Sequence, residues 1–323
     1  MNCRFAILLM SVCFALSAHA VCAQSQFTEV GDNSRVAPSA TDHVRIAKTT
    51  TEFATVVEQV DDFVKKYGTR NVLLVVDLDN TLLAMNQDLG SDQWFTWQET
   101  LLEKDSNHPA LVADDFVDLL EIQGKLFSLG AMHPPEPGLP AMMGELTNQR
   151  ITVLILTSRG KEYRDAAERE LKRNDYDISQ STFDIREKRG VFKPYSKERA
   201  NEHGLNAQVI DRLGSPRSVT YSNGIYMTAG QHKGYMLKTL LARGKDSSRE
   251  NRFAQFKAIV FVDDRLKHTE RMHEAFADEP IDLATFRYSR EDDNVEKFNH
   301  STKRHVMHDW EQLNHVIESV MGK

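Results

Sequence analysis

The chain has 323 residues, of which 41% are hydrophobic and 27% are charged. This is the composition of a globular protein that is large enough to bury its own core, and it argues against extensive disorder. The 40 basic and 47 acidic side chains leave a formal charge of −7, which gives no field to attract a polyanion. Nucleic acid is therefore not expected as a partner.

Residues 1–23 have the pattern of a cleaved export signal. Arg4 supplies a positive charge, an apolar run follows, and residues 18–20 (Ala-His-Ala) fit a cleavage site of small residues. The run is shorter than the roughly 20 apolar residues that span a bilayer, so no stable membrane span is expected after cleavage; a retained anchor is the alternative. We expect an exported protein, periplasmic or secreted, with a lipoprotein attached through Cys22 as a second alternative.

The cysteines lie in or beside this segment, at Cys3, Cys13 and Cys22. Because cleavage would leave at most one thiol, the mature chain would have no internal disulfide. Metal sites built from cysteines are excluded for the same reason.

The rest of the chain alternates between two kinds of apolar pattern, after a polar stretch at residues 24–50 that predicts a mobile leader. Four short apolar runs predict strands buried on both faces of a parallel sheet, at 71–76, 151–156, 219–227 and 258–262. Helical periodicity occurs at 51–67, 139–149, 161–173, 233–243 and 266–276. The alternation predicts an α/β fold with a doubly wound parallel sheet, in which ligands bind outside the carboxyl ends of the strands.

Residues 85–132 interrupt this alternation with mostly helical patterning. We interpret them as a helical cap inserted into an α/β core formed by residues 51–84 and 133–323. The polar loop at residues 90–93 (Gly-Ser-Asp-Gln) is a candidate for a substrate contact. Aromatic residues that follow it either form the cap's own core, which we favour, or close over a substrate: Trp94, Phe95 and Trp97.

The predicted strands deliver chemically suitable side chains to one edge of the sheet. In chain order these are a carboxylate pair, a hydroxyl pair, a lysine and a second carboxylate pair: Asp77 with Asp79, Thr157 with Ser158, Lys233, and Asp263 with Asp264. Paired carboxylates suit a divalent metal ion, and they also let one group attack while the other handles a proton. Hydroxyl, backbone N–H and ammonium groups beside them would hold an anion.

Each group, taken singly, has an ordinary structural explanation. Acidic residues at a strand end can cap the following turn, and a hydroxyl before Gly160 can cap the next helix. A lysine is most often on the surface. Asp263 and Asp264 could instead pair with Arg265 or Lys267. The four groups together carry more information than any one of them.

The four groups resemble the motifs of the haloacid dehalogenase (HAD) superfamily. The matching segments are "DLDNTLL" at 77–83, "LILTSRG" at 154–160, the Lys233 of "HKGYML", and "FVDDR" at 261–265. The insertion between the first and second segments also fits. Within it, "GSDQWFTW" at 90–97 resembles the DUF2608 type, an uncharacterised branch found in bacterial exported proteins.

The resemblance implies a phosphohydrolase that requires Mg²⁺ and acts on small phosphomonoesters. Asp77 would attack phosphorus to form an aspartyl-phosphate, and Asp79 would protonate the leaving group and then activate water. The metal would be held by Asp77, by the backbone carbonyl of Asp79, and by Asp263 with Asp264 nearby, either of which could be the direct ligand. The phosphoryl group would contact Thr157, Ser158 and Lys233.

Several alternatives remain open at this point. The spacing from Thr157 to Lys233 is long, so Lys193 or Lys197 could fill the place of the lysine. The presence of Asp79 disfavours a dehalogenase, which lacks that second carboxylate. A phosphotransferase acting on an alcohol acceptor and a catalytically weak binding or effector protein are the rival functions.

Overall fold

A computed structural model describes residues 43–185, 190–244 and 255–322. The predicted export signal and most of the predicted leader lie outside these residues. Within them, none of the helices has the length and apolar character needed to cross a membrane.

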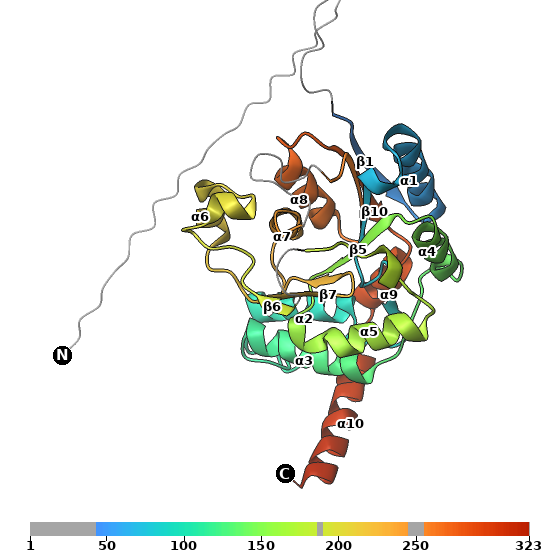
Figure 1. The fold of residues 1–323 in the computed structure, drawn as a ribbon. Coiled ribbons are helices and arrows are strands. Elements are labelled where there is room, and N and C mark those ends of the chain that lie inside the picture. Colours follow the sequence, from blue (N-terminus) through green and yellow to red (C-terminus); the bar gives the residue numbers. More distant parts are fainter. Residues whose placement is uncertain (1–42, 186–189, 245–254, 323) are drawn as a thin grey trace, which may run out of the picture. The chain divides into compact units, whose positions relative to one another are not determined.

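The described residues form a mixed α/β structure around one large sheet (Figure 1). The order of its eight strands in the described chain is β1-β10-β9-β2-β5-β8-β7-β6. Neighbours from β1 to β8 in this order pair in parallel, whereas β7 is antiparallel to both β8 and β6. The strands are β1 (Arg45–Thr50), β2 (Val72–Val76), β5 (Thr152–Thr157), β6 (Gly190–Phe192), β7 (Val219–Ser222), β8 (Ile225–Met227), β9 (Ala258–Asp263) and β10 (Asp282–Tyr288).

Helices cover both faces of the sheet (Figure 1). In β2, Val72, Leu74 and Val76 point to one face and Leu73 and Val75 to the other, because successive side chains of a strand alternate. The first face is covered by α1 (Ala54–Tyr67), α4 (Leu139–Asn148) and α5 (Arg164–Arg173). The second face is covered by α6 (Ala207–Leu213), α7 (Lys233–Leu241) and α8 (Leu266–Phe276). The predicted α/β fold with a mostly parallel sheet is therefore confirmed.

One of the predicted strands is a pair of strands in the structure. The apolar run at 219–227 forms the antiparallel hairpin of β7 and β8, which turns at Asn223 and Gly224. Both turn residues have a positive φ, 49° and 75°, as a tight two-residue hairpin turn requires.

The predicted leader is wrong at its carboxyl end. Residues 45–50 form β1, which pairs in parallel with β10 at the edge of the sheet. Most of its side chains are exposed, so an edge strand of this kind has no apolar run that would distinguish it from a polar loop. Asp282 of β10 also holds this segment, since its carboxylate accepts the backbone N–H of Val44 at 2.9 Å.

The segment between β2 and β5 contains α2 (Asp92–Lys104) and α3 (Phe116–Leu129). Its two ends meet in an antiparallel pair, β3 (Ala84–Met85) with β4 (Met132–His133). The two helices share a hydrophobic core that is separate from the cores on the two faces of the sheet. We refer to residues 86–131 as the insertion.

The insertion core includes residues from the far end of the chain. The helices α9 (Asp292–His300) and α10 (Arg304–Met321) contribute Phe298 and Val306 to it. These side chains pack with Trp94 and Leu119 of the insertion. The C-terminal helices, which the sequence assigned to the α/β core, therefore also cover the insertion.

Candidate functional site

Two carboxylates and a lysine meet at the carboxyl edge of the sheet. Asp77 follows β2 and Asp263 ends β9, and these strands are parallel neighbours. The Nζ atom of Lys233, the first residue of α7, lies 2.5 Å from Oδ1 of Asp77 and 2.6 Å from Oδ2 of Asp263. All three side chains are buried, so this is a desolvated charge cluster and not a surface ion pair.

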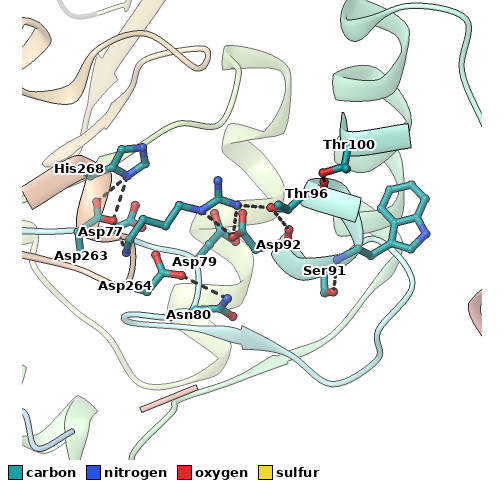
Figure 2. Close-up of polar contacts among 12 residues, drawn as sticks. Asp77, Asp79, Asn80, Ser91, Asp92, Thr96, Thr100, Asp263, Asp264 and His268 are labelled. Carbon is teal, nitrogen blue, oxygen red and sulfur yellow. Dashed lines mark hydrogen bonds and ion pairs between the residues drawn. The ribbon is translucent and has the colours of Figure 1, made fainter. Parts of the chain in front are cut away.

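Asp263 is fixed by further polar contacts (Figure 2). Its Oδ1 atom accepts the backbone N–H of Arg265 at 3.0 Å, and Nδ1 of His268 lies 3.0 Å from the same oxygen. Burial acts to raise the pKa of Asp263, but Lys233 and His268 outweigh it and hold this pKa below its ordinary value. Asp263 is thus the carboxylate of the cluster that is best held as an anion.

A third carboxylate completes a group that could hold a metal ion. Ligand atoms of Asp77, Asp263 and Asp264 all lie within 4.8 Å of one another. Burial and the neighbouring carboxylates raise the pKa of Asp77 and that of Asp264 well above the ordinary value. Burial is the largest cause of both shifts, and the charge of Lys233 at Asp77 and that of Arg265 at Asp264 do not outweigh it. Oxygen ligands in this number suit Mg²⁺.

The turn after β2 brings Asp79 into the same pocket as Asp77 and Asp264. Asn80 adopts a left-handed φ of 55°, and its N–H donates to the carbonyl of Leu83 at 2.8 Å. Both oxygens of Asp79 accept N–H groups of Arg159, one of them from Nε at 2.9 Å. The guanidinium of Arg159 lies 3.2 Å from the centre of the Phe127 ring, in α3 of the insertion. Arg159 therefore links Asp79 to the insertion.

The two predicted hydroxyls have different positions. Thr157 is fully buried, and its Oγ1 accepts the backbone N–H of Arg159 at 3.1 Å. Ser158 is partly exposed and lines the pocket above the carboxylates. Its carbonyl accepts the N–H of Gly230 at 2.7 Å, which ties the end of β5 to the loop that leads to Lys233. Of these two residues, Ser158 is thus the one that lines the pocket.

The pocket lies between the strand ends, α8 and the insertion, and has a volume of about 110 Å³. Phe95 of α2 and Phe116 and Leu120 of α3 supply its apolar wall. Arg265 joins the two sides: its Nε donates to Asp92 of α2 at 2.9 Å, and its Nη2 donates to Thr96 at 2.7 Å (Figure 2). The pocket is smaller than the 300–1,000 Å³ that is usual for larger ligands.

A family model described as protein of unknown function (DUF2608) matches residues 49–321. The chain belongs to the DUF2608 family. No curated protein matches it. The matched range contains every residue of the pocket, so the pocket lies within the DUF2608 region of the chain.

In this DUF2608 chain the predicted site residues lie at one place. Asp77, Lys233, Asp263 and Asp264 form the charge cluster, Asp79 and Ser158 line the same pocket, and Thr157 is buried behind Ser158. The two other candidate lysines lie elsewhere: the exposed Lys193 donates to the carbonyl of Pro216, and the exposed Lys197 pairs with Asp211.

The site of this DUF2608 member also contains residues that the sequence analysis missed. They are Arg159, Arg265 and His268. Arg159 and Arg265 lie within two of the segments that carry the resemblance, which is the only signal for them in the sequence. Their partners, Asp79 and Asp92, are 80 and 173 positions away along the chain, so neither pairing could be inferred from local spacing.

Some residues of the insertion pack in its core, and others line the pocket. Trp94 is 1% exposed and belongs to the insertion core, as we favoured, whereas Phe95 also reaches the pocket. In the polar loop, Ser91 caps α2 by accepting the N–H of Trp94 at 3.2 Å. Asp92 is the residue of that loop that binds across the pocket, to Arg265.

Proposed function

We propose that the chain is a Mg²⁺-dependent phosphohydrolase of the HAD type, acting on small phosphomonoesters through an aspartyl-phosphate on Asp77. The proposal rests above all on the position of Lys233, whose ammonium lies between Asp77 and Asp263 beside a third carboxylate. Residues 1–23 would direct this enzyme to the periplasm or out of the cell.

The donor set is suited to the metal that this function needs. Asp77, Asp263 and Asp264 offer oxygen ligands, which are the type that Mg²⁺ prefers, and their excess negative charge favours a divalent cation. Bound there, Mg²⁺ would offset the negative charge of the phosphoryl group as it is transferred.

The side chains divide the reaction between them. Asp77 would attack phosphorus while the neighbouring Lys233, whose pKa is raised by Asp263 and Asp77 against the opposing effect of burial, stays charged and steadies the phosphoryl oxygens. Ser158 would donate its hydroxyl to the same group, since it lines the pocket. These contacts would orient the phosphoryl group for attack from Asp77.

Asp79 would transfer the proton, first to the leaving group and then from water. Both of its oxygens accept N–H groups of Arg159 in the structure, and each oxygen keeps a second lone pair on which Asp79 would carry the proton. The apolar side chains of the insertion, among them Phe95 and Phe116, would exclude bulk water from the pocket during this step.

Phosphate release from an aryl phosphate tests the proposal. We expect turnover that depends on added Mg²⁺ and that falls by about a thousandfold or more in Asp77→Asn. The exposed Asp62→Asn makes the same chemical change on α1 and should leave turnover unchanged. Undiminished turnover in Asp77→Asn would disprove the mechanism. If the wild-type chain released no phosphate from a broad set of phosphoesters, a binding protein would be favoured instead.

A further inference from the structure

The pocket is lined by five carboxylates and five lysine or arginine side chains, and two of these cations have no partner in an ion pair within the described part of the chain. Three of the carboxylates pair with cations: Asp77 with Lys233, Asp79 with Arg159, and Asp92 with Arg265. The other lining carboxylates are Asp264, in the group that could hold a metal ion, and Glu99; the other lining cations are Lys267 and Arg271 of α8. Within residues 43–185, 190–244 and 255–322, neither side chain has a hydrogen bond or ion pair.

These two cations share one face of α8, because they are four positions apart. Lys267 is exposed at the mouth of the pocket and Arg271 is half-buried. The pKa of Lys267 is lowered by burial and by the charges of Arg271 and Arg265, against a smaller opposing effect of Glu99 and Glu103 on α2. The cations therefore repel one another, and an anion between them would be favourable.

The carboxylate of α8 that acts on the charge of Arg271 does not neutralise it. Glu274 is already bound by Arg212, whose Nη2 lies 2.5 Å from its Oε1, and by the hydroxyl of Tyr235 at 3.2 Å. His232 lies 3.3 Å from its other oxygen. Glu274 raises the pKa of Arg271, but burial outweighs it and the pKa is lowered.

The packing of α7 on α8 keeps Arg271 close to the charge cluster. Gly234 follows Lys233, and a Cβ atom at Gly234 would lie 2.4 Å from the carbonyl oxygen of Arg271. Only glycine permits this close approach of the two helices. Arg271 also lines a second pocket, which adjoins the first at Gly230 and contains Arg212 and Arg217. The region beyond the cluster therefore has a positive lining where the rest of a substrate would extend.

We propose that Lys267 and Arg271 bind a second anionic group of the substrate, on the side of the pocket that continues towards Gly230. The substrate is then a small phosphomonoester that carries a further phosphate or carboxylate. This inference rests on the proposed function, because the first anion is the phosphoryl group that Asp77 attacks. Arg271 offers a planar fork suited to either second group, and Lys267 offers a point charge.

Equilibrium binding of unreactive phosphonates tests the inference without any need for turnover. Calorimetry on the purified chain in excess Mg²⁺ would compare α,ω-alkylene diphosphonates of increasing length with alkylphosphonates of matched length. We expect the diphosphonate of the best length to bind about tenfold or more tightly than its match, and Lys267→Gln and Arg271→Gln each to remove most of this difference. Carboxyalkylphosphonates would show whether a carboxylate serves as the second anion.

Matched variants control for loss of charge. Lys65→Gln and Arg290→Gln remove the same charges from exposed positions outside α8 and outside the pocket lining, and should keep the preference for two anions. Equal binding of diphosphonates and alkylphosphonates, or a preference that survives both Lys267→Gln and Arg271→Gln, would overturn the inference whether or not the chain hydrolyses aryl phosphates. A preference lost in both variants, in a chain that hydrolyses no phosphoester, would keep the anion site and reject the phosphohydrolase.

Discussion

The floor and the wall of the pocket are built in different ways. The floor consists of strand ends, and its charged groups, such as Asp77, Lys233 and Asp263, are fully desolvated and bind one another. The wall is formed by the insertion, which meets the floor through the ion pair of Arg265 with Asp92 and the stacking of Arg159 on Phe127. The charge cluster therefore depends on the sheet, whereas the shape of the pocket also depends on a segment with its own core.

Removal of the lysine from the floor should have the largest effect on stability. Lys233→Met leaves Asp77 and Asp263 buried without their counter-charge, so we expect the free energy of unfolding to fall by about 3–5 kcal/mol. Denaturant unfolding measures this, and added Mg²⁺ should restore part of the loss. Lys65→Met, at an exposed position, should change stability little. An equally stable Lys233→Met would mean that the cluster is not a desolvated charge network.

The carboxylates of the floor should contribute to the dependence of stability on pH. In metal-free buffer the raised pKa values of Asp77 and Asp264 mean that the folded state keeps protons that the unfolded chain releases. Their contribution is therefore complete below the ordinary pKa of 3.8 and is lost as the pH rises through the raised values. Asp263 has the opposite shift, so its contribution is lost as the pH falls below 3.8.

Mg²⁺ should restore the stability that is lost at higher pH, because a bound cation favours the ionised carboxylates. At a concentration about 100 times its Kd, it should stabilise the fold by about 2.7 kcal/mol. Thermal unfolding across the pH range, with chelator and with Mg²⁺, measures both effects. Asp264→Asn should flatten the pH profile and weaken the response to Mg²⁺; unchanged behaviour in this variant would exclude Asp264 from the metal site.

A methyl group added to α3 should disturb the wall and leave the floor intact. A Cβ atom at Gly124 would lie 1.7 Å from Cζ of Tyr163, so Gly124→Ala should cost about 1–3 kcal/mol and displace the insertion. Tryptophan fluorescence, which reports Trp94, Trp97 and Trp310 in and against the insertion core, should change while Mg²⁺ binding persists.

The same substitution in α4 is its control. A Cβ atom at Gly144 meets nothing within 4 Å, so Gly144→Ala should stabilise the helix by roughly 0.5–1 kcal/mol. Equal effects of Gly124→Ala and Gly144→Ala would show that α3 does not depend on its close contact with Tyr163.

Substitution of Arg159, which links Asp79 to the insertion, should have the smallest effect on function. Arg159→Lys keeps the charge beside Asp79 but loses the two-pronged contact and the flat stacking on Phe127. We expect kcat to fall by roughly tenfold, equivalent to about 1.4 kcal/mol, with little change in KM. Arg173→Lys, at an exposed position of α5, is the control. A change in KM alone would place Arg159 in substrate binding and not in the positioning of Asp79.

The sequence predicted the parts of the fold that have continuous apolar patterns. The buried strands β2, β5 and β9 and the helix α8 were found because their side chains meet apolar surfaces along most of their length. β10 was missed because Asp282 and Thr285 interrupt its apolar run. Asp282 is buried only because Val44, Lys66 and Tyr67 bind its carboxylate, and these contacts exist only in the folded chain. By contrast, the pair Asn223-Gly224 is a sequence signal for a hairpin turn, and the prediction of one strand at 219–227 overlooked it.

The candidate site was predictable where strand ends carry its residues. Parallel strands bring their carboxyl ends to one edge, so the positions of Asp77 and Asp263 followed from the strand assignment. The contacts of Arg159 and Arg265 did not follow from it, since they depend on how the insertion lies over the sheet. No periodicity in the sequence encodes that arrangement.

The insertion core has a consequence for the order in which the parts of the chain can fold during synthesis. Trp94 is synthesised early, but it is covered in part by Phe298 and Val306, which emerge from the ribosome much later. The strands β2, β5 and β9 and their helices can pack before α9 and α10 exist. The wall of the pocket is therefore the last region to mature, and the nascent protein has its charged floor before it has a closed pocket.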